Sequence, residues 1–163
     1  MDTKMDKIVL YYHRYNKSSS SHIEEELDSV EALEKRLLEL RDLLAGRDQS
    51  GKTQYIPAVD VRVLDINDNR TNDDIGLDES YMSIALDENS MLLFYDASRD
   101  CYLNSVGDPT NNETTEELYD FGQPCETSMK YIIPYQDALD CLKYWVTNKH
   151  IDSSTGILTD NWW

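Results

Sequence analysis

The hydrophobic positions near the start of the chain change from a strand-like pattern to a helical one. Residues 8–15, IVLYYHRY, are rich in β-branched and aromatic side chains and end at a serine-rich stretch, which predicts a strand followed by a loop. From Val30 the apolar residues recur at steps of three and four, which places them on one stripe of a helix: Leu33, Leu37, Leu40 and Leu44. Asp28 is the expected N-cap, Glu31 its capping-box partner and Gly46 the stop.

The middle of the chain alternates between apolar and polar residues, as half-buried strands do. In residues 57–66 two sets fall on opposite faces, namely Val59, Val61 and Val63 against Asp60, Arg62 and Asp65. A polar loop is expected at residues 67–80. Residues 80–96 contain two apolar runs separated by Asp87, Glu88, Asn89 and Ser90, which predicts a hairpin, and residues 101–107 are the expected third strand of a meander.

The last third predicts a long loop and a second helix. Residues 108–117, DPTNNETTEE, contain nothing to bury and are expected to be an exposed loop. The segment MKYIIP leads from a last strand to Pro134, which suits a first helical turn, and is followed by a second apolar stripe: Ala138, Leu139, Leu142, Trp145 and Val146. The order of these elements predicts an α+β fold in one domain over residues 1–163, with a mainly antiparallel sheet and two helices packed on one face.

Composition adds a strong charge to this picture. The chain of 163 residues has 32 acidic and 15 basic side chains, hence a formal net charge of −17. Such a surface repels phosphate backbones and anionic lipids, so direct binding to nucleic acid or membranes is not expected. A basic protein would be attracted to it. The acidity could also serve only to keep the protein soluble.

The chain has no run of eighteen apolar residues and its start lacks the features of a signal peptide, which predicts a cytoplasmic protein.

The sequence gives little support for a metal or cofactor site. Cys101, Cys125 and Cys141 show no CxxC spacing and are expected to be reduced, mostly structural thiols rather than disulfides or zinc ligands, with Cys101 and Cys141 in the core. The alternation of Asp65, Asn67 and Asn69 resembles a calcium loop, but Arg70 and Gly76 stand where Gly and Glu are required: the sixth and twelfth positions. We therefore expect no metal and no cofactor.

Catalytic motifs are equally weak. The GKT at residues 51–53 lacks the upstream glycine of a phosphate-binding loop. None of the three histidines stands in a local signature with a cysteine: His13, His22 and His150. Adjacent acids, at 73–74 and at 116–117, lie in polar loops, whereas acid–base catalysis needs a pocket that raises one pKa. An enzyme that uses carboxylates remains an alternative without a motif, and we expect no enzyme.

The negative charge is concentrated in two predicted loops. Residues 65–79 contain six acids against Arg70, and residues 108–126 contain six acids and no base, so together they carry −11 of the −17. A concentrated field can be directed at one partner, although a charge run is often only a solvated surface. The residues predicted to contact a basic partner are Asp65, Asp68, Asp73, Asp74, Asp78, Glu79, Glu113, Glu116 and Glu117.

The second half of the chain resembles a known family. The segments MLLFYD, CYLNSVG, LYDFG and YIIPYQDALDCLKYWV, with a terminal tryptophan, are similar over residues 91–163 to the immunity protein 1 family of bacterial polymorphic toxin systems. Its YxSVG-like stretch matches Tyr102, Ser105, Val106 and Gly107, and its closing tryptophan matches Trp162 or Trp163. One departure is that the family has Thr, Gly and Pro before this tryptophan, whereas this chain has Thr147, Asn148 and a longer stretch through Asp160.

The resemblance implies a small cytoplasmic protein that binds and neutralises a cognate secreted toxin, often a nucleic-acid deaminase or nuclease. Such a toxin needs basic residues for its polyanionic substrate, and an inhibitor of charge −17 would complement them. An acidic protein that imitates DNA toward a nucleic-acid enzyme is a related alternative. We expect a terminal indole to fold back onto the core beside Tyr144 and Trp145, while an exposed anchor for the toxin is the competing hypothesis.

Overall fold

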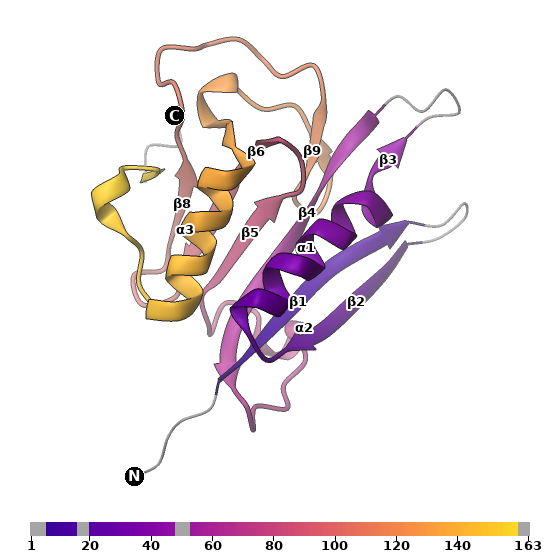
Figure 1. Ribbon diagram of the computed structural model, residues 1–163, viewed down its shortest axis with the longest axis vertical. Helices are drawn as coiled ribbons and strands as arrows, with labels where there is room; N and C mark the ends of the chain where they lie inside the picture. The colour runs from indigo at the N-terminus through magenta and orange to yellow at the C-terminus, as the bar shows by residue number, and fades with distance from the viewer. Residues whose placement is uncertain (1–5, 16–19, 48–52, 160–163) are drawn as a thin grey trace.

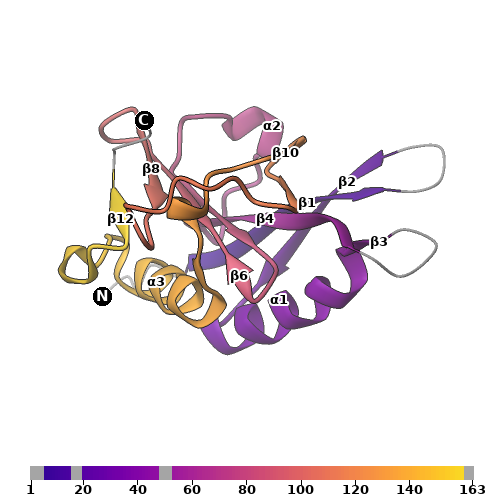
Figure 2. The same ribbon diagram turned by 90° about the horizontal axis from the view of Figure 1, so that it is seen from above.

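A mainly antiparallel sheet forms the body of the protein, and two long helices cover one of its faces (Figures 1 and 2). The computed structural model describes residues 6–15, 20–47 and 53–159. Within them the helices are α1 (Val30–Leu44), α2 (Asn72–Ile75) and α3 (Tyr135–Asn148), with 3₁₀ turns η1 (Met129–Tyr131) and η2 (Ser153–Thr155). The predicted α+β class and mainly antiparallel sheet are confirmed.

Ten of the described strands belong to the large sheet. They are β1 (Asp6–Tyr15), β2 (Ser20–Leu27), β3 (Gly46–Arg47), β4 (Thr53–Asp65), β5 (Tyr81–Ala85), β7 (Leu92–Asp96), β8 (Cys101–Ser105), β9 (Leu118–Asp120), β10 (Pro124–Cys125) and β12 (Leu158–Thr159). The order β10-β9-β4-β5-β7-β8-β12 contains one parallel pair, β4 with β9, and β1 joins β2 to β4. Two further strands, β6 (Asn89–Ser90) and β11 (Ile133–Pro134), pair with each other.

The core lies between the sheet and the two long helices. The strands contribute Leu10, Val59, Val61, Met82, Ile84 and Leu92, the first helix contributes its four predicted leucines, and α3 contributes its five predicted apolar residues. Edge-to-face contact between Phe94 and Trp145, whose ring centroids are 5.5 Å apart, joins β7 to α3. The two apolar stripes are therefore where the sequence placed them. The meander of β5, β7 and β8 is also confirmed by antiparallel pairing.

The boundaries of the first helix differ from the prediction. Ser29, not Asp28, is the N-cap, and its side chain accepts a hydrogen bond from the amide of Ala32 at 3.1 Å. Glu31 is therefore not the partner in a capping box, because the helix begins one residue later than expected. The helix ends at Ala45 with non-helical backbone, and Gly46 already belongs to β3.

The loop expected after the first strand is largely a second strand. Residues 20–27 form β2, which pairs antiparallel with β1 along its length, and the prediction missed it because its sequence, SSHIEEEL, is mostly polar. An edge strand needs few apolar residues, and here Ile23 and Leu27 pack against the core. Glu25 ties the strand to α1, since it accepts hydrogen bonds from Arg36 Nε at 2.8 Å.

The end of the chain forms α3 and then adds a last short strand, β12, to the sheet. Pro134 is the N-cap residue of α3 rather than part of its first turn, and the segment that leads into the helix consists of η1 and the short strand β11. Beyond α3 the chain turns through η2 and returns, so that Leu158 pairs with Ser105 of β8. The tail thus closes one edge of the sheet. The terminal tryptophans, Trp162 and Trp163, lie outside the described residues.

Gly107, in the segment that resembles the family motif, is required by a close approach of two chain segments. Its amide donates to the carbonyl of Lys130 at 2.8 Å. A Cβ atom at this position would lie 2.2 Å from the carbonyl oxygen of Ile132. The absence of a side chain therefore allows the segment after β8 to pack directly against the backbone that leads into α3.

Candidate functional site

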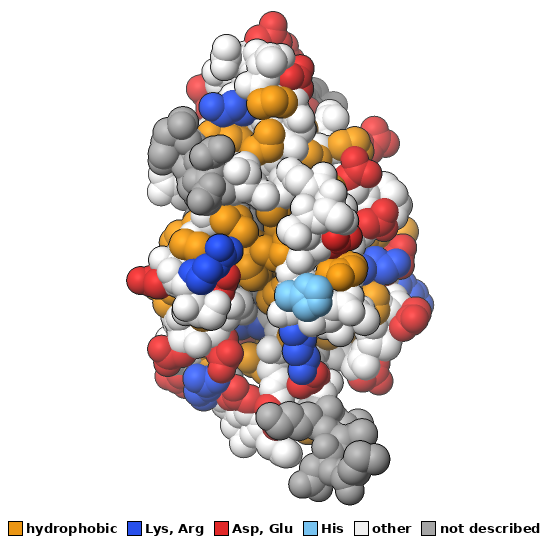
Figure 3. All heavy atoms as spheres, turned by 90° about the vertical axis from the view of Figure 1, so that its left-hand side faces the viewer, with side chains coloured by type: hydrophobic (Ala, Val, Ile, Leu, Met, Phe, Trp, Pro, Cys, Tyr) orange, Lys and Arg blue, Asp and Glu red, His pale blue; other side chains and the backbone are white. Residues whose placement is uncertain are grey.

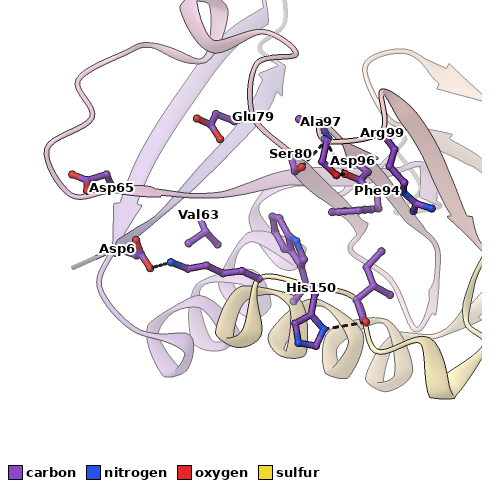
Figure 4. Close-up of a pocket in the computed structure, with 14 residues that line it drawn as sticks. Asp6, Val63, Asp65, Glu79, Ser80, Phe94, Asp96, Ala97, Arg99 and His150 are labelled. Carbon is purple, nitrogen blue, oxygen red and sulfur yellow. Dashed lines mark hydrogen bonds and ion pairs between the residues drawn. The ribbon is translucent and has the colours of Figure 1, made fainter. Parts of the chain in front are cut away.

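A large hollow lies where α3 ends, beside the ends of β4 and β7 and the start of β5. Its volume is about 710 Å³, which is within the range of ligand and docking pockets. Figure 3, which looks at this side of the molecule, shows hydrophobic side chains in a hollow bordered by charged ones. Figure 4 shows the residues that line it, from strands and from the end of α3.

The floor of the hollow is the open end of the hydrophobic core. Val63, Phe94 and Trp145 line it, and the latter two are 4% and 5% exposed. The helix that covers this face stops at Lys149, which adopts the left-handed conformation with φ 61° and donates its amide to the carbonyl of Trp145 at 2.7 Å. Because the helical cover stops here while the sheet continues, Val63 is partly exposed and a small part of each ring borders the hollow.

The rim of the hollow carries more acids than bases. Of the described residues that line it, four are acids (Asp6, Asp65, Glu79 and Asp96), two are permanently cationic (Arg99 and Lys149) and one is His150. Both cations are already paired, since Lys149 Nζ contacts the carboxylate of Asp6 and Arg99 Nε lies 2.8 Å from Asp96 Oδ2. In Figure 4 the acids Asp6, Asp65 and Glu79 lie on one side and Arg99 on the other.

The acid partnered by Arg99 is held in its charged form. Burial acts to raise the pKa of Asp96, but hydrogen bonds from Ser98 and Arg99 outweigh it and leave the pKa below its ordinary value. By contrast, Asp65 accepts a hydrogen bond from the uncharged amide of Asn67 at 2.8 Å. The negative charge that remains available to a ligand is therefore on the side of Asp65 and Glu79.

The segment between β4 and β5, residues 66–80, borders the hollow through Glu79 and Ser80 and contains all of the first acidic segment except Asp65, which ends β4. It is ordered rather than merely solvated: Thr71 and Asp74 form a capping box at the start of α2, and Ile75 is buried with Val9 and Leu64. The acidic residues Asp68, Asp73, Asp74 and Asp78 lie on it. Arg70 binds Asp68 at 2.8 Å and Glu79 at 3.1 Å, and its hydrogen bonds lower the pKa of Asp68 to about 2.

Arg62 of β4 holds the 66–80 segment against the sheet. Its guanidinium donates to the carbonyls of Glu79 and Gly76, both at 2.8 Å, and to Asn72 Oδ1 at 3.1 Å. The residue is 5% exposed, although its alternation with the valines of β4 predicted a solvent-facing position. Sequence reasoning missed this role because the cover on the second face of the sheet comes from a segment without a hydrophobic pattern.

The same segment displays large apolar side chains to solvent. Ile66 is 45% exposed and Leu77 is 52% exposed, and both are surrounded in sequence by the six acids of residues 65–79. The sequence contained part of this signal, because Tyr, Leu or Ile near both acidic loops is typical of an interface with an apolar centre and a charged rim. It did not single out these two residues, since Ile66 ends the predicted strand and exposure is not readable from the sequence.

The second acidic loop lies elsewhere. Glu113, Glu116 and Glu117 line a separate hollow of about 310 Å³ together with Tyr119 and Met129. In Figure 1 this loop is at one end of the long axis of the molecule and the 66–80 segment is at the other. The structure thus brings together six of the nine predicted contact residues, those from Asp65 to Glu79, and separates them from the other three.

The acid with a raised pKa does not lie in the large hollow. Burial raises the pKa of Asp60, whose carboxylate accepts a hydrogen bond from the hydroxyl of Ser83. It lines a recess of only about 40 Å³ beside His13 and Asp120, which has room for little more than water. Within the described residues, Asp60 is thus the acid with a raised pKa, and it lines a recess too small for the substrate pocket that the carboxylate-enzyme alternative needs.

The described residues form no metal site, and the three thiols differ in burial. No group of three or more His, Cys, Asp or Glu within residues 6–15, 20–47 and 53–159 is placed to hold a metal ion. Burial raises the pKa of the Cys141 thiol to about 11, as expected for a core thiol, whereas Cys101 is only partly buried, so the core prediction is right for Cys141 and not for Cys101; Cys125 is exposed. None of the described helices is both long enough and apolar enough to cross a membrane.

Comparisons of this chain with models of protein families, with curated proteins and with solved structures gave no match. The similarity to the immunity protein 1 family therefore stays a prediction from the sequence.

Proposed function

We propose that this protein is an immunity protein that binds a basic toxin domain through the surface formed by the 66–80 segment and the adjacent hollow. The observation that carries the proposal is the exposure of Ile66 and Leu77 within residues 65–79, which carry six carboxylates, of which Asp65 and Glu79 line the hollow. Apolar contacts in the middle and charges around them are the usual composition of a protein-binding surface. The family resemblance and the charge of −17 support the same function.

Each part of this surface has a separate role in binding. The carboxylates accelerate the encounter with a cationic partner, and this contribution falls as salt screens the field. The two apolar side chains supply affinity, because exposed aliphatic surface becomes buried in the complex. Arg62 and the capping box of α2 hold the segment in place before binding, which reduces the entropy lost when the complex forms.

Inhibition follows from the charge of the partner. A nuclease or nucleic-acid deaminase carries a basic substrate cleft, so an acidic surface that covers this cleft excludes the polyanionic substrate. The complex is stoichiometric and requires no catalysis by the immunity protein. The glutamates of the other loop, Glu113, Glu116 and Glu117, lie at the far end of the molecule and contribute to the long-range field rather than to this contact.

The proposal predicts that a basic toxin domain is encoded beside the gene for this protein, and it is tested with that domain. The substitutions Ile66→Ser and Leu77→Ser are introduced together, and calorimetry measures their effect on affinity for that domain. Burial of each side chain contributes about 1 to 2 kcal/mol, or about 2 to 4 kcal/mol for the pair, so we expect binding to weaken by roughly 30- to 700-fold. Protection of cells that express the toxin should be lost in parallel.

A matched control uses two leucines of α1 with similar exposure, Leu38 at 59% and Leu43 at 48%. Leu38→Ser with Leu43→Ser removes comparable apolar surface away from the proposed contact and should leave affinity unchanged. If both pairs of substitutions weaken binding equally, or if no toxin domain binds the unmodified protein, the proposal is wrong.

A further inference from the structure

We infer that the 710 Å³ hollow receives one lysine or arginine side chain of the protein partner, with its aliphatic stem on the apolar floor and its cationic head beside Asp65 and Glu79. This inference relies on the proposed function only for the identity of the partner. The occupant follows from the chemistry of the hollow, which combines an apolar floor with a negative end.

The floor suits the stem of a long basic side chain. Val63, Phe94 and Trp145 present apolar surface at the end of the core. Lysine and arginine cover such surface with their methylene groups while the charged head stays near water. The hollow is larger than one side chain, so the backbone on either side of the inserted residue can also enter it.

The charge of the hollow selects a cation. Its own cations, Arg99 and Lys149, are neutralised by Asp96 and Asp6. At the other side Arg70 is shared among three acids, at 2.8 Å from Asp68, 3.1 Å from Glu79 and 4.0 Å from Asp78, so this side keeps a negative excess.

The end of α3 adds to the same potential. The helix is 14 residues long and its last turn borders the hollow through Trp145 and Lys149. The carbonyl end of a helix carries a partial negative charge, which favours a nearby cation. Apolar floor, carboxylates and helix end therefore all favour an amphipathic cation over an anion or a purely apolar group.

The experiment uses short peptides and does not need the toxin. The probes are acetyl-Gly-Arg-Gly-amide and acetyl-Gly-Lys-Gly-amide, compared with peptides that contain citrulline or norleucine, which keep the stem and lack the charge. Amide chemical shifts of the ¹⁵N-labelled protein report where each peptide binds. We expect the charged peptides to shift the amides of Asp65, Glu79, Ala97 and Lys149, and the neutral peptides to bind several-fold more weakly.

Two variants test the site itself. Asp65→Asn with Glu79→Gln should weaken binding of the arginine peptide by about three- to tenfold, as expected for two partly exposed ion pairs. The matched control, Glu116→Gln with Glu117→Gln, removes the same charge from the other end of the molecule and should leave binding unchanged. Ala97→Arg places a guanidinium of the protein within the hollow, because Ala97 lines it, and should abolish peptide binding.

Several results would overturn the inference. Equal affinity for arginine and citrulline peptides would show that charge does not select the occupant. Shifts confined to other parts of the protein, or equal losses in the two double variants, would show that the hollow is not the site. If the arginine peptide binds as described and the toxin domain does not bind, the proposed function fails while this inference stands. Toxin binding that Ala97→Arg leaves intact would reject the inference and keep the function.

Discussion

Replacement of Arg62 by methionine should release the 66–80 segment from the sheet. Methionine keeps most of the apolar stem of arginine and removes the guanidinium, which makes three hydrogen bonds to this segment. It also removes the contact of Arg62 Cζ with the ring of Tyr81, 5.0 Å from its centroid. The carbonyls of Gly76 and Glu79 would then lose these charged donors.

The magnitude follows from two opposing contributions. Hydrogen bonds that involve a charged group contribute about 1.5 to 3 kcal/mol each, so three of them favour folding by roughly 5 to 9 kcal/mol. Removal of a guanidinium from water costs several kcal/mol, and burial accordingly lowers the pKa of Arg62, although Asp60 nearby acts to raise it. We expect Arg62→Met to lower the free energy of unfolding by about 3 kcal/mol.

Urea denaturation measures the total effect, and hydrogen exchange shows where it arises. The amides of Ile75, Gly76 and Asp78 donate hydrogen bonds within the segment. If the segment opens separately from the core, these amides should exchange on the order of 100-fold faster, since 1.4 kcal/mol corresponds to a factor of ten. Arg99→Met is the control: that side chain is 62% exposed, and its loss should change stability by less than about 0.5 kcal/mol. Equal effects of the two substitutions, or unchanged exchange in the segment, would refute the anchoring role.

Three further predictions concern stability. Arg36 lowers the pKa of Glu25, so the ion pair stabilises the fold above the ordinary glutamate pKa of about 4.3 and this contribution is lost as the pH falls through the folded-state value. Glu25→Gln should therefore destabilise by about 1 to 2 kcal/mol at pH 7, and urea denaturation near pH 2.5 should show little difference from the unmodified protein. Gly107→Ala should cost about 1 to 3 kcal/mol, because the new methyl group would meet the Ile132 carbonyl, and an unchanged melting temperature would contradict this. Burial raises the pKa of Asp60, so its charge opposes folding as the pH rises above about 3.9. The Asp60→Asn variant should therefore be no less stable than the unmodified protein at pH 7. A clear decrease in its free energy of unfolding, measured by urea denaturation, would disprove this reasoning.

The helices and the meander could be predicted because each has a local signal. The leucine stripe of α1 and the apolar stripe of α3 follow the helical period, and both stripes are buried as expected. In β4 the alternation of Val59 and Val61 with polar residues marks the face that meets the helices. Period and burial coincide in these elements, so the pattern alone identifies them.

The edge strand and the anchored segment could not be predicted in this way. β2 is mostly polar and becomes a strand because β1 offers it a pairing edge and Arg36 of α1 binds Glu25. Arg62 looks solvent-facing in the alternation of β4, yet it is covered by residues 66–80, which follow no hydrophobic period. In both cases the stabilising partner is distant in the sequence.

For the candidate site, too, some features could be predicted from the sequence and others depend on the tertiary structure. The sequence by itself determined the charge of −17, its concentration in two segments and the identity of the acids, because charge is additive and needs no fold. Only the tertiary structure decided that these segments lie at opposite ends, and that Asp65 and Glu79 join Asp6, Phe94 and Trp145 around one hollow. A hollow is formed by side chains from several elements, and their convergence depends on how the sheet and α3 pack together.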